Sequence, residues 1–136
     1  MPLVSRKAVL AIAAVVDVAV NASERPVSAR ALAARHNLPP RHLEPVLQAL
    51  VRDGILKGIR GPHGGYALGR ERKRITAEDI VRAASRAEEQ EEPPLPPSPL
   101  LNDVLRPVLA EAERAFASAL ARISIDDIAR RAEALK

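Results

Sequence analysis

The sequence predicts a mainly α-helical fold: a winged helix-turn-helix with a small β-hairpin wing, followed by a long C-terminal helix. Three observations lead to this prediction. Residues 38–52 have the pattern of a helix with one apolar face, residues 55–68 read as two short strands around a basic, glycine-rich loop, and residues 101–123 carry a long apolar stripe. In winged helices, one helix enters the DNA major groove and the hairpin tip reaches the neighbouring backbone or minor groove. The order of elements therefore indicates DNA binding.

Size and composition limit the alternatives. A chain of 136 residues suits one domain with an appendage. It contains no cysteine, which excludes disulfides, thiolate-held zinc or iron–sulfur sites and cysteine nucleophiles. The apolar run 8–22 is interrupted by Asp17 and is too short and too polar to span a bilayer. We therefore expect a buried amphipathic helix there, a cytoplasmic location and no membrane partner.

Charge is distributed unevenly along the chain. Residues 1–75 carry 13 Lys plus Arg against 5 Asp plus Glu, whereas residues 76–136 carry 8 against 12. The basic half contains the predicted helix-turn-helix, and a positively charged surface is what binding to DNA phosphates requires. A merely solvated basic surface would give the same count, so charge alone leaves both interpretations open.

Two helices are expected before the recognition helix. The first spans residues 5–21. Its larger apolar residues fall near one face at helical spacing: Val9, Ile12, Ala13, Val16 and Val20. Ser28 is a suitable N-cap for a second helix through His36, because its hydroxyl can accept a free amide of the first turn. Asn37 would form the turn.

The recognition helix begins at Pro39-Pro40, where missing backbone amides cost little. Its predicted inner face is Leu43, Val46, Leu47 and Leu50, at positions i, i+3, i+4 and i+7. Pro45 removes one backbone hydrogen bond, but it lies near enough to the start for the helix to survive.

The outward side chains of this helix are the candidates for base-edge or phosphate contacts. Arg41, His42 and Gln48 offer donors to major-groove acceptors. Glu44 could accept from cytosine N4 or reject bases that present only acceptors. Exposed polar residues that make no contact with DNA would give the same sequence pattern on this helix.

The wing consists of strands at 55–59 and 66–68 around the loop 60–65. Arg60, at the hairpin tip, can enter a narrow minor groove with enhanced negative potential. The other expected wing contacts are Lys57, Gly61, His63 and Gly64. Lys57 and the basic residues at 70 and 72–74 are predicted to contact phosphates or to form a solvated rim, which sets affinity and not sequence preference.

The sequence gives little support for an enzyme or for a metal-binding protein. Gly61, Gly64 and Gly65 could cradle a nucleotide phosphate, but no P-loop or dinucleotide-binding spacing accompanies them. The histidines at 36, 42 and 63 are spread over three elements, and no serine has a nucleophile-elbow context. We expect no catalytic residues, no metal site and no cofactor.

Beyond the wing, Thr76 with Asp79 predicts a capping box for a helix through about Arg86, with Ile80, Val81 and Ala84 inward. Residues 88–99 change to glutamates and then prolines, which predicts an extended linker. The predicted organisation is a DNA-binding domain at 1–87, the linker at 88–99, and a dimerisation helix with a short last helix at 100–136.

The long helix begins near 101–103, has Pro107 in or near its first turn and spans roughly 34 Å. Its predicted dimerisation residues are Leu101, Val104, Leu105, Val108, Leu109, Ala112, Phe116 and Leu120. No local partner is large enough to cover this stripe, so we expect a homodimer. The alternative is that the helix folds back onto its own winged helix. Ser124 with Asp127 should cap the last helix.

The run 43–50, and above all Arg-Gly-Pro-His-Gly-Gly-Tyr at 60–66, resembles the Rrf2 family of bacterial transcription regulators, in particular its IscR-like group. The similarity extends over nearly the whole chain, to the closing segment 123–128. It implies a winged helix-turn-helix joined to a long helix that crosses its counterpart in a homodimer. By position, it implies recognition contacts at Arg41, His42, Glu44 and Pro45, and a minor-groove contact at Arg60.

The sequence departs from this family at two places. Pro45 stands where IscR-like members have an amide side chain, which leaves the DNA sequence preference open. Glutamates and prolines fill 88–99, where cluster-binding relatives carry three cysteines, so no thiolate-held iron–sulfur cluster can act as the sensor. The resemblance to cysteine-free relatives implies a small-molecule or protein effector.

The predicted function is therefore a homodimeric regulator, of the repressor type, that binds a pseudo-palindromic operator in double-stranded DNA. The alternative is a winged-helix protein-interaction module that has lost specific DNA binding, which Pro45 and the acidic linker would allow. Salt dependence separates the two, because each neutralised phosphate contributes a slope of about −0.9 in log affinity against log salt.

Overall fold

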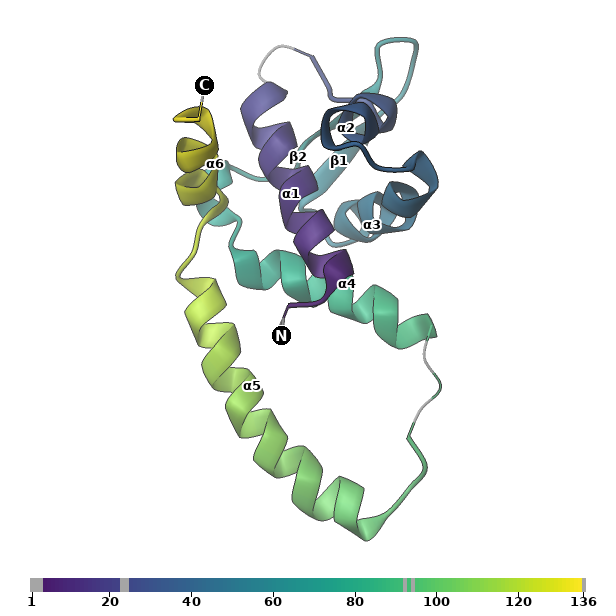
Figure 1. Cartoon of the computed structure of the whole chain (residues 1–136), viewed down its shortest axis with the longest axis vertical. Coiled ribbons are helices and arrows are strands. Elements are labelled where there is room, and N and C mark those ends of the chain that lie inside the picture. The colour runs from purple at the N-terminus through teal and green to yellow at the C-terminus, as the bar shows by residue number, and fades with distance from the viewer. Residues whose placement is uncertain (1–3, 23–24, 92, 94, 136) are drawn as a thin grey trace.

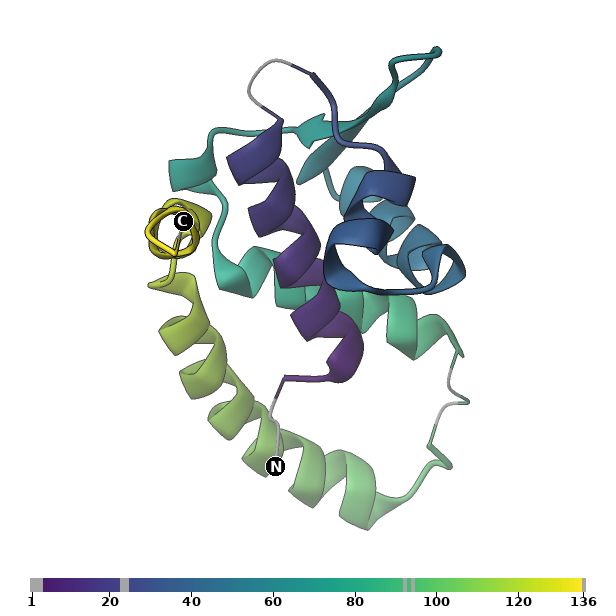
Figure 2. The ribbon, with the colours of Figure 1, turned by 45° about the horizontal axis from the view of Figure 1, so that its top comes forward.

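The computed structural model describes residues 4–22, 25–91, 93 and 95–135. Its elements are α1 (Arg6–Asn21), α2 (Ala29–His36), α3 (Pro40–Arg52), β1 (Leu56–Ile59), β2 (Gly65–Leu68), η1 (Arg72–Arg74), α4 (Ala77–Glu91), η2 (Leu100–Leu105), α5 (Arg106–Ala121) and α6 (Ile125–Glu133). Helices α1 to α4 and the hairpin pack together, while α5 arches away from them (Figures 1 and 2). The predicted mainly helical winged helix-turn-helix fold is confirmed.

Helix α1 is the central helix of the core. Ser5 caps it, accepting a hydrogen bond from the Ala8 amide at 3.2 Å. Its buried apolar residues are Ala8, Ala11, Ala14, Val15 and Val18. The predicted stripe that includes Val9 and Val16 is not the core face, because Val9 is exposed and Val16 only half-buried.

Helix α3 presents the predicted inner face. Leu43, Val46, Leu47 and Leu50 are all buried in the common core. The helix passes through Pro45 without interruption, as expected for a proline near the N-terminal end. The antiparallel hairpin follows in the register Leu56 opposite Leu68 and Ile59 opposite Gly65, within one residue of the predicted strands.

Helix α4 begins at the predicted capping box, in which Thr76 and Asp79 exchange hydrogen bonds of 3.1 Å. Ile80 and Ala84 are buried and Val81 is half-buried. The helix ends at Glu91, beyond the predicted end at Arg86, because Ala, Glu and Gln are good helix formers. Residues 93 and 95–98 form no helix or strand, and positions 92 and 94 of the predicted linker lie outside the described residues.

The long helix comprises η2 and α5, with Pro107 in the first turn of α5. The Arg106 amide reaches the Leu101 carbonyl, five residues back, in a wider turn than an α-helix makes. Together the two elements span about 33 Å. None of the described helices is long and apolar enough to cross a membrane.

Helix α6 returns to the N-terminal part of the molecule, where it packs on α1 and η1. Ser124 and Asp127 form its predicted capping box. Ile125 and Ala129 are buried, and the Ile125 amide donates to the Ile75 carbonyl at 2.7 Å. The end of the described chain is therefore bound into the core near the base of the wing.

Candidate nucleic-acid interface

A sharp turn sets the angle between α2 and α3. Asn37 adopts the left-handed conformation (φ 55°, ψ 47°) that ends α2, and the Leu38 amide donates to the Ala33 carbonyl at 2.9 Å. Asn tolerates this conformation better than most residues. With Ser28 capping the start of α2, the two helices form the helix-turn-helix that the sequence predicts.

The outer face of α3 is polar and open. The exposed side chains on it are Arg41, His42, Glu44, Pro45, Gln48 and Arg52. The opposite face is held in the core by its leucines. The structure thus brings all five predicted recognition-helix residues onto one accessible surface. Pro45 contributes only an apolar ring to this surface, with neither donor nor acceptor on its side chain.

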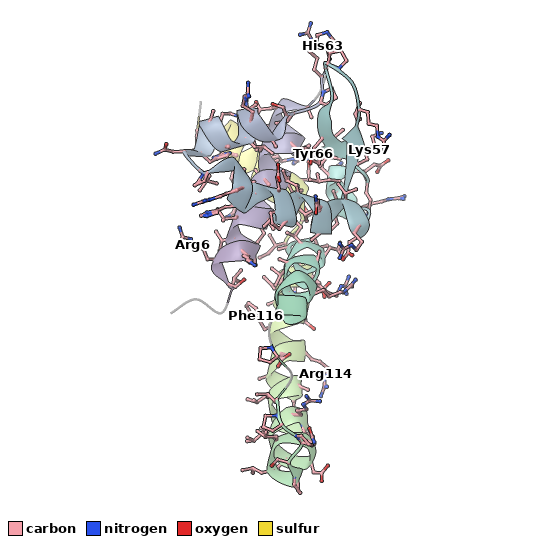
Figure 3. All side chains as sticks on the ribbon, turned by 90° about the vertical axis from the view of Figure 1, so that its right-hand side faces the viewer. Arg6, Lys57, His63, Tyr66, Arg114 and Phe116 are labelled. Atoms are coloured by element: carbon pink, nitrogen blue, oxygen red, sulfur yellow. The ribbon has the colours of Figure 1, made fainter. Side chains whose placement is uncertain are left out.

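The wing projects beyond the helices, with His63 at its tip and Lys57 on β1 (Figure 3). Lys57, Arg60, Gly61 and His63 are exposed, and Gly64 is half-buried. The loop closes with a hydrogen bond from the Gly64 amide to the Gly61 carbonyl at 2.9 Å. A side chain at Gly64 would collide with the Ile59 carbonyl, so this position needs glycine for steric reasons.

A short β-bridge ties the wing to the start of α2. Val27 and Tyr66 exchange backbone hydrogen bonds of 2.9 and 2.8 Å. Gly65 makes this approach possible, since an added Cβ would lie 2.5 Å from the Val27 carbonyl oxygen. The sequence analysis did not identify Val27 as a contact. As a consequence, Pro62 and His63 border the same surface hollow as Arg25 and Ser28.

Arginine and lysine residues on this face have no acidic partner. Among the described residues, Arg41, Arg52, Lys57 and Arg60 are exposed and form no ion pair, and the same holds for Arg30 on α2. Arg30 was missed by the sequence analysis. Its position could have identified it, because Arg30 is a basic residue in the first turn of the first helix of the helix-turn-helix.

Arg70 and Arg72, in contrast, form ion pairs within the chain. Arg70 lies 3.3 Å from Asp79, and the Nε of Arg72 lies 2.8 Å from Asp126. A second Arg72 nitrogen pairs with Glu133 at 3.0 Å. Arg70 and Arg72 thus link the wing base to α4 and α6, and a phosphate contact at these residues stays a prediction.

A buried carboxylate fixes the end of α2 to α1. The Asp17 side chain is 3% exposed and receives two hydrogen bonds from Arg35 at 2.7 and 2.8 Å. His36 Nε2 lies 2.7 Å from the same carboxylate, and Asn21 donates at 3.2 Å. Burial alone would raise the pKa of Asp17, but these hydrogen bonds outweigh it and hold the pKa below its usual 3.8. We call Asp17, Asn21, Arg35 and His36 the Asp17 clamp.

Much of the predicted dimerisation stripe is uncovered. Val104, Leu105, Val108, Leu109 and Ala112 are exposed, and Leu101, Phe116 and Leu120 are half-buried. Phe116 and Leu120 border a hollow shared with Val81 of α4, so the C-terminal half of α5 partly packs on its own winged helix. Within the described part of the chain, Val104, Leu105, Val108 and Leu109 in the N-terminal half stay exposed.

The residues do not fit a thiolate-held metal centre. The chain has no cysteine. Within the described ranges, no three His, Asp or Glu side chains are grouped so that they could hold a metal ion.

Comparison with known proteins decides the family. Residues 4–131 match the profile of Rrf2, described as an iron-dependent transcriptional regulator. The chain belongs to the Rrf2 family. It is 34% identical to the transcriptional regulator CymR of Bacillus subtilis over 74% of this chain and 67% of CymR. It is also 34% identical to IscR of Xenorhabdus nematophila, over 54% of this chain but only 44% of that protein.

Solved structures support the same assignment for the fold. CymR of B. subtilis, described as a global cysteine regulator, superimposes with a TM-score of 0.73 at 28% identity, covering 96% of this chain and 98% of CymR. IscR of T. potens gives a TM-score of 0.74 at 29% identity, covering 99% and 91%. Rrf2 regulators bind DNA, and the relatives are transcription regulators and not enzymes.

Proposed function

We propose that this Rrf2 protein is a cytoplasmic homodimeric repressor that binds a pseudo-palindromic operator through two winged helices. The observation that carries the proposal is the combined surface of α3 and the wing. Arg41, Lys57 and Arg60 are exposed on it and have no acidic partner among the described residues, whereas Arg70 and Arg72 are paired within the chain. Unpaired cations beside a polar helix face are what phosphates and base edges require.

Each element of the surface has a separate role in this proposal. Arg41, His42, Glu44 and Gln48 meet base edges or phosphates in the major groove, with the Pro45 ring between them. Arg60, supported by Gly61, His63 and Gly64, enters the minor groove, and Lys57 contacts a phosphate. The uncovered stripe of α5 holds the two copies together, and an effector, a small molecule or a protein, controls binding.

A salt titration of binding to mixed-sequence duplex DNA tests the DNA-binding role. We expect log affinity to fall steeply with log salt, because each neutralised phosphate contributes about −0.9 to the slope. Lys57→Ala should weaken binding and make the slope shallower by about 1. Arg131→Ala is the control, since Arg131 is exposed on α6, a helix on the other side of α1 from α3 (Figure 1). A flat titration for the unaltered chain would favour the protein-interaction alternative.

A further inference from the structure

A hollow lies between α4 and α5, where the long helix passes the winged helix. Its volume is about 520 Å³, within the range of small-molecule sites in proteins. Small side chains line it on both helices, with Ser85 on α4 and Ala110 and Ala117 on α5. They leave space where larger side chains would bring the two helices into full contact. We call this space the α4–α5 hollow.

The hollow combines an apolar wall with charges of both signs. Val81, Phe116 and Leu120 supply the apolar wall. Glu113 and Arg114 also line the hollow, are exposed and form no ion pair among the described residues. Arg114 and Phe116 are two positions apart on one helix, so they flank the hollow from different sides. One carboxylate and one guanidinium are therefore free to meet a ligand.

The α4 side of the hollow adds a free hydroxyl. Ser85 is half-buried, and its side chain has no hydrogen-bond partner among the described residues. The two charged α4 residues that line the hollow are Glu78 and Arg82, which pair with each other at 3.1 Å. The unpaired polar groups of the hollow are thus the Ser85 hydroxyl and the two charges on α5.

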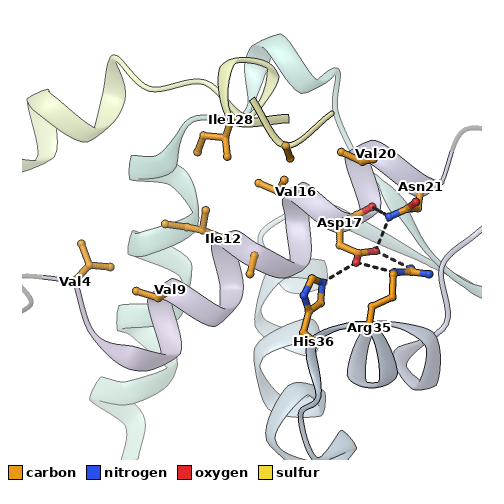
Figure 4. Close-up of a pocket in the computed structure, with 12 residues that line it drawn as sticks. Val4, Val9, Ile12, Val16, Asp17, Val20, Asn21, Arg35, His36 and Ile128 are labelled. Carbon is orange, nitrogen blue, oxygen red and sulfur yellow. Dashed lines mark hydrogen bonds and ion pairs between the residues drawn. The ribbon is translucent and has the colours of Figure 1, made fainter. Parts of the chain in front are cut away.

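An apolar groove along α1 differs in this respect. Its volume is similar, about 550 Å³, but its charged side chains belong to the Asp17 clamp and are bonded to one another (Figure 4). The α4–α5 hollow instead keeps charges of both signs without a partner in the described part of the chain, and these select a particular class of ligand.

We infer that the α4–α5 hollow binds a small zwitterion of the amino-acid type. The Arg114 guanidinium donates to the carboxylate of the ligand, the ammonium group of the ligand donates to Glu113, and its apolar part lies against Phe116. This inference rests on the proposed function and deepens it, because it gives the proposed effector a site and a chemical class. A ligand that contacts both α4 and α5 favours one placement of the winged helix against the long helix, which is how it acts on DNA binding.

A thermal-shift screen of the protein amino acids against the full chain tests the site. We expect at least one amino acid to raise the melting temperature, because a ligand of the folded state stabilises it. Calorimetry then compares this amino acid with two analogues, one without the ammonium group and one without the carboxylate. Each analogue should bind about 5-fold more weakly, the effect of one solvent-accessible ion pair.

Substitutions assign each charge. Arg114→Gln should lower the affinity for the amino acid about 5-fold but leave that for the analogue without a carboxylate unchanged. Glu113→Gln should do the same for the analogue without an ammonium group. Arg106→Gln and Glu111→Gln are the matched controls, because both residues are exposed on α5 outside the hollow. Ala117→Leu should abolish binding by filling the space, and circular dichroism should show this variant folded.

The link to DNA is measured separately. Saturating amino acid should change the affinity for duplex DNA at least about 5-fold, and Ala117→Leu should lose this response. An unchanged DNA affinity would overturn the effector role. DNA binding by a chain that binds no amino acid, or that binds both analogues as tightly as the amino acid, would overturn the zwitterion site alone. Amino acid binding by a chain that binds no DNA would support the site and contradict the proposed regulator.

Discussion

Arg60 shows, at the scale of one residue, how a side chain can be available to DNA without contributing to the fold. It lies exposed on the wing loop and forms no ion pair among the described residues. We predict that Arg60→Ala lowers specific binding to the operator by about 1 to 3 kcal/mol and leaves thermal stability unchanged. Fluorescence anisotropy and a melting curve measure the two effects.

The matched control is Arg131→Ala, because Arg131 is exposed on α6 and that helix lies on the other side of α1 from α3 (Figure 1). It should change neither binding nor melting. Operator affinity that is equal in Arg60→Ala and in the unaltered chain would disprove the assignment of the wing to the minor groove.

Asp17, in contrast to Arg60, contributes to the stability of the fold, since its side chain is buried and hydrogen-bonded within the chain. Asp17→Asn keeps the volume but removes the charge that Arg35 and His36 approach. We predict that the free energy of unfolding at pH 7 falls by about 1.5 to 3 kcal/mol, the range for hydrogen bonds to charged groups. Urea titrations measure it. Asp103→Asn is the control, because Asp103 is exposed and has no ion pair among the described residues.

The same residue predicts a pH dependence with a definite sign. The pKa of Asp17 is lower in the folded state than its usual 3.8. The stability that Asp17 contributes is therefore fully present above that usual value and is lost as pH falls through the folded-state pKa. The stability difference between the unaltered chain and Asp17→Asn should shrink as pH falls below 3.8. A difference that stays constant down to pH 3 would contradict the clamp.

At the scale of elements, the wing is positioned by its bridge to the start of α2. Gly65 has φ +152°, and an added Cβ would meet the Val27 carbonyl. We predict that Gly65→Ala destabilises the protein by about 1 to 3 kcal/mol and weakens DNA binding, because the wing loses its anchor. Gly58→Ala, with no atom within 4 Å of the added Cβ, should change stability by less than about 0.5 kcal/mol. Equal melting temperatures in the two variants would contradict the role of the bridge.

Local patterns in the sequence predicted most of these elements. Helix α3 has one apolar face, so its leucines were assigned correctly to the core, and the boxes at Thr76 and Ser124 are short-range pairs that sequence spacing reveals. The surface of α3 and the wing also follows from local spacing, because the residues left over from the core face must point outward.

Helix α1 shows where such reasoning fails. Apolar residues surround most of its circumference, so periodicity could not decide which side is buried. Packing decided it, since the side that carries Ala8, Ala11 and Ala14 together with Val15 and Val18 is the side buried in the core. The clamp between Asp17 and Arg35, and the pairing of Arg72 with Asp126, join residues far apart in the sequence. No local pattern marks such pairs.

At the scale of the molecule, α6 lies between the long helix and the base of the wing. Helix α6 continues from α5 and packs on α1, while Arg72 ties η1 at the wing base to Asp126 and Glu133 of α6. Ion pairs thus join η1, at the base of the wing, to the helix that follows α5. In the proposed dimer, this connection also sets the distance between the two recognition helices.

Selection of DNA from a random duplex pool by the purified protein tests the central claim most directly. We predict a palindromic consensus whose half-sites are centred about one helical turn, or a multiple of it, apart, bound by two chains per duplex. The base preference opposite Pro45 would be read from the same data. Recovery of no consensus, or of a single half-site bound by one chain, would contradict a homodimeric operator-binding regulator.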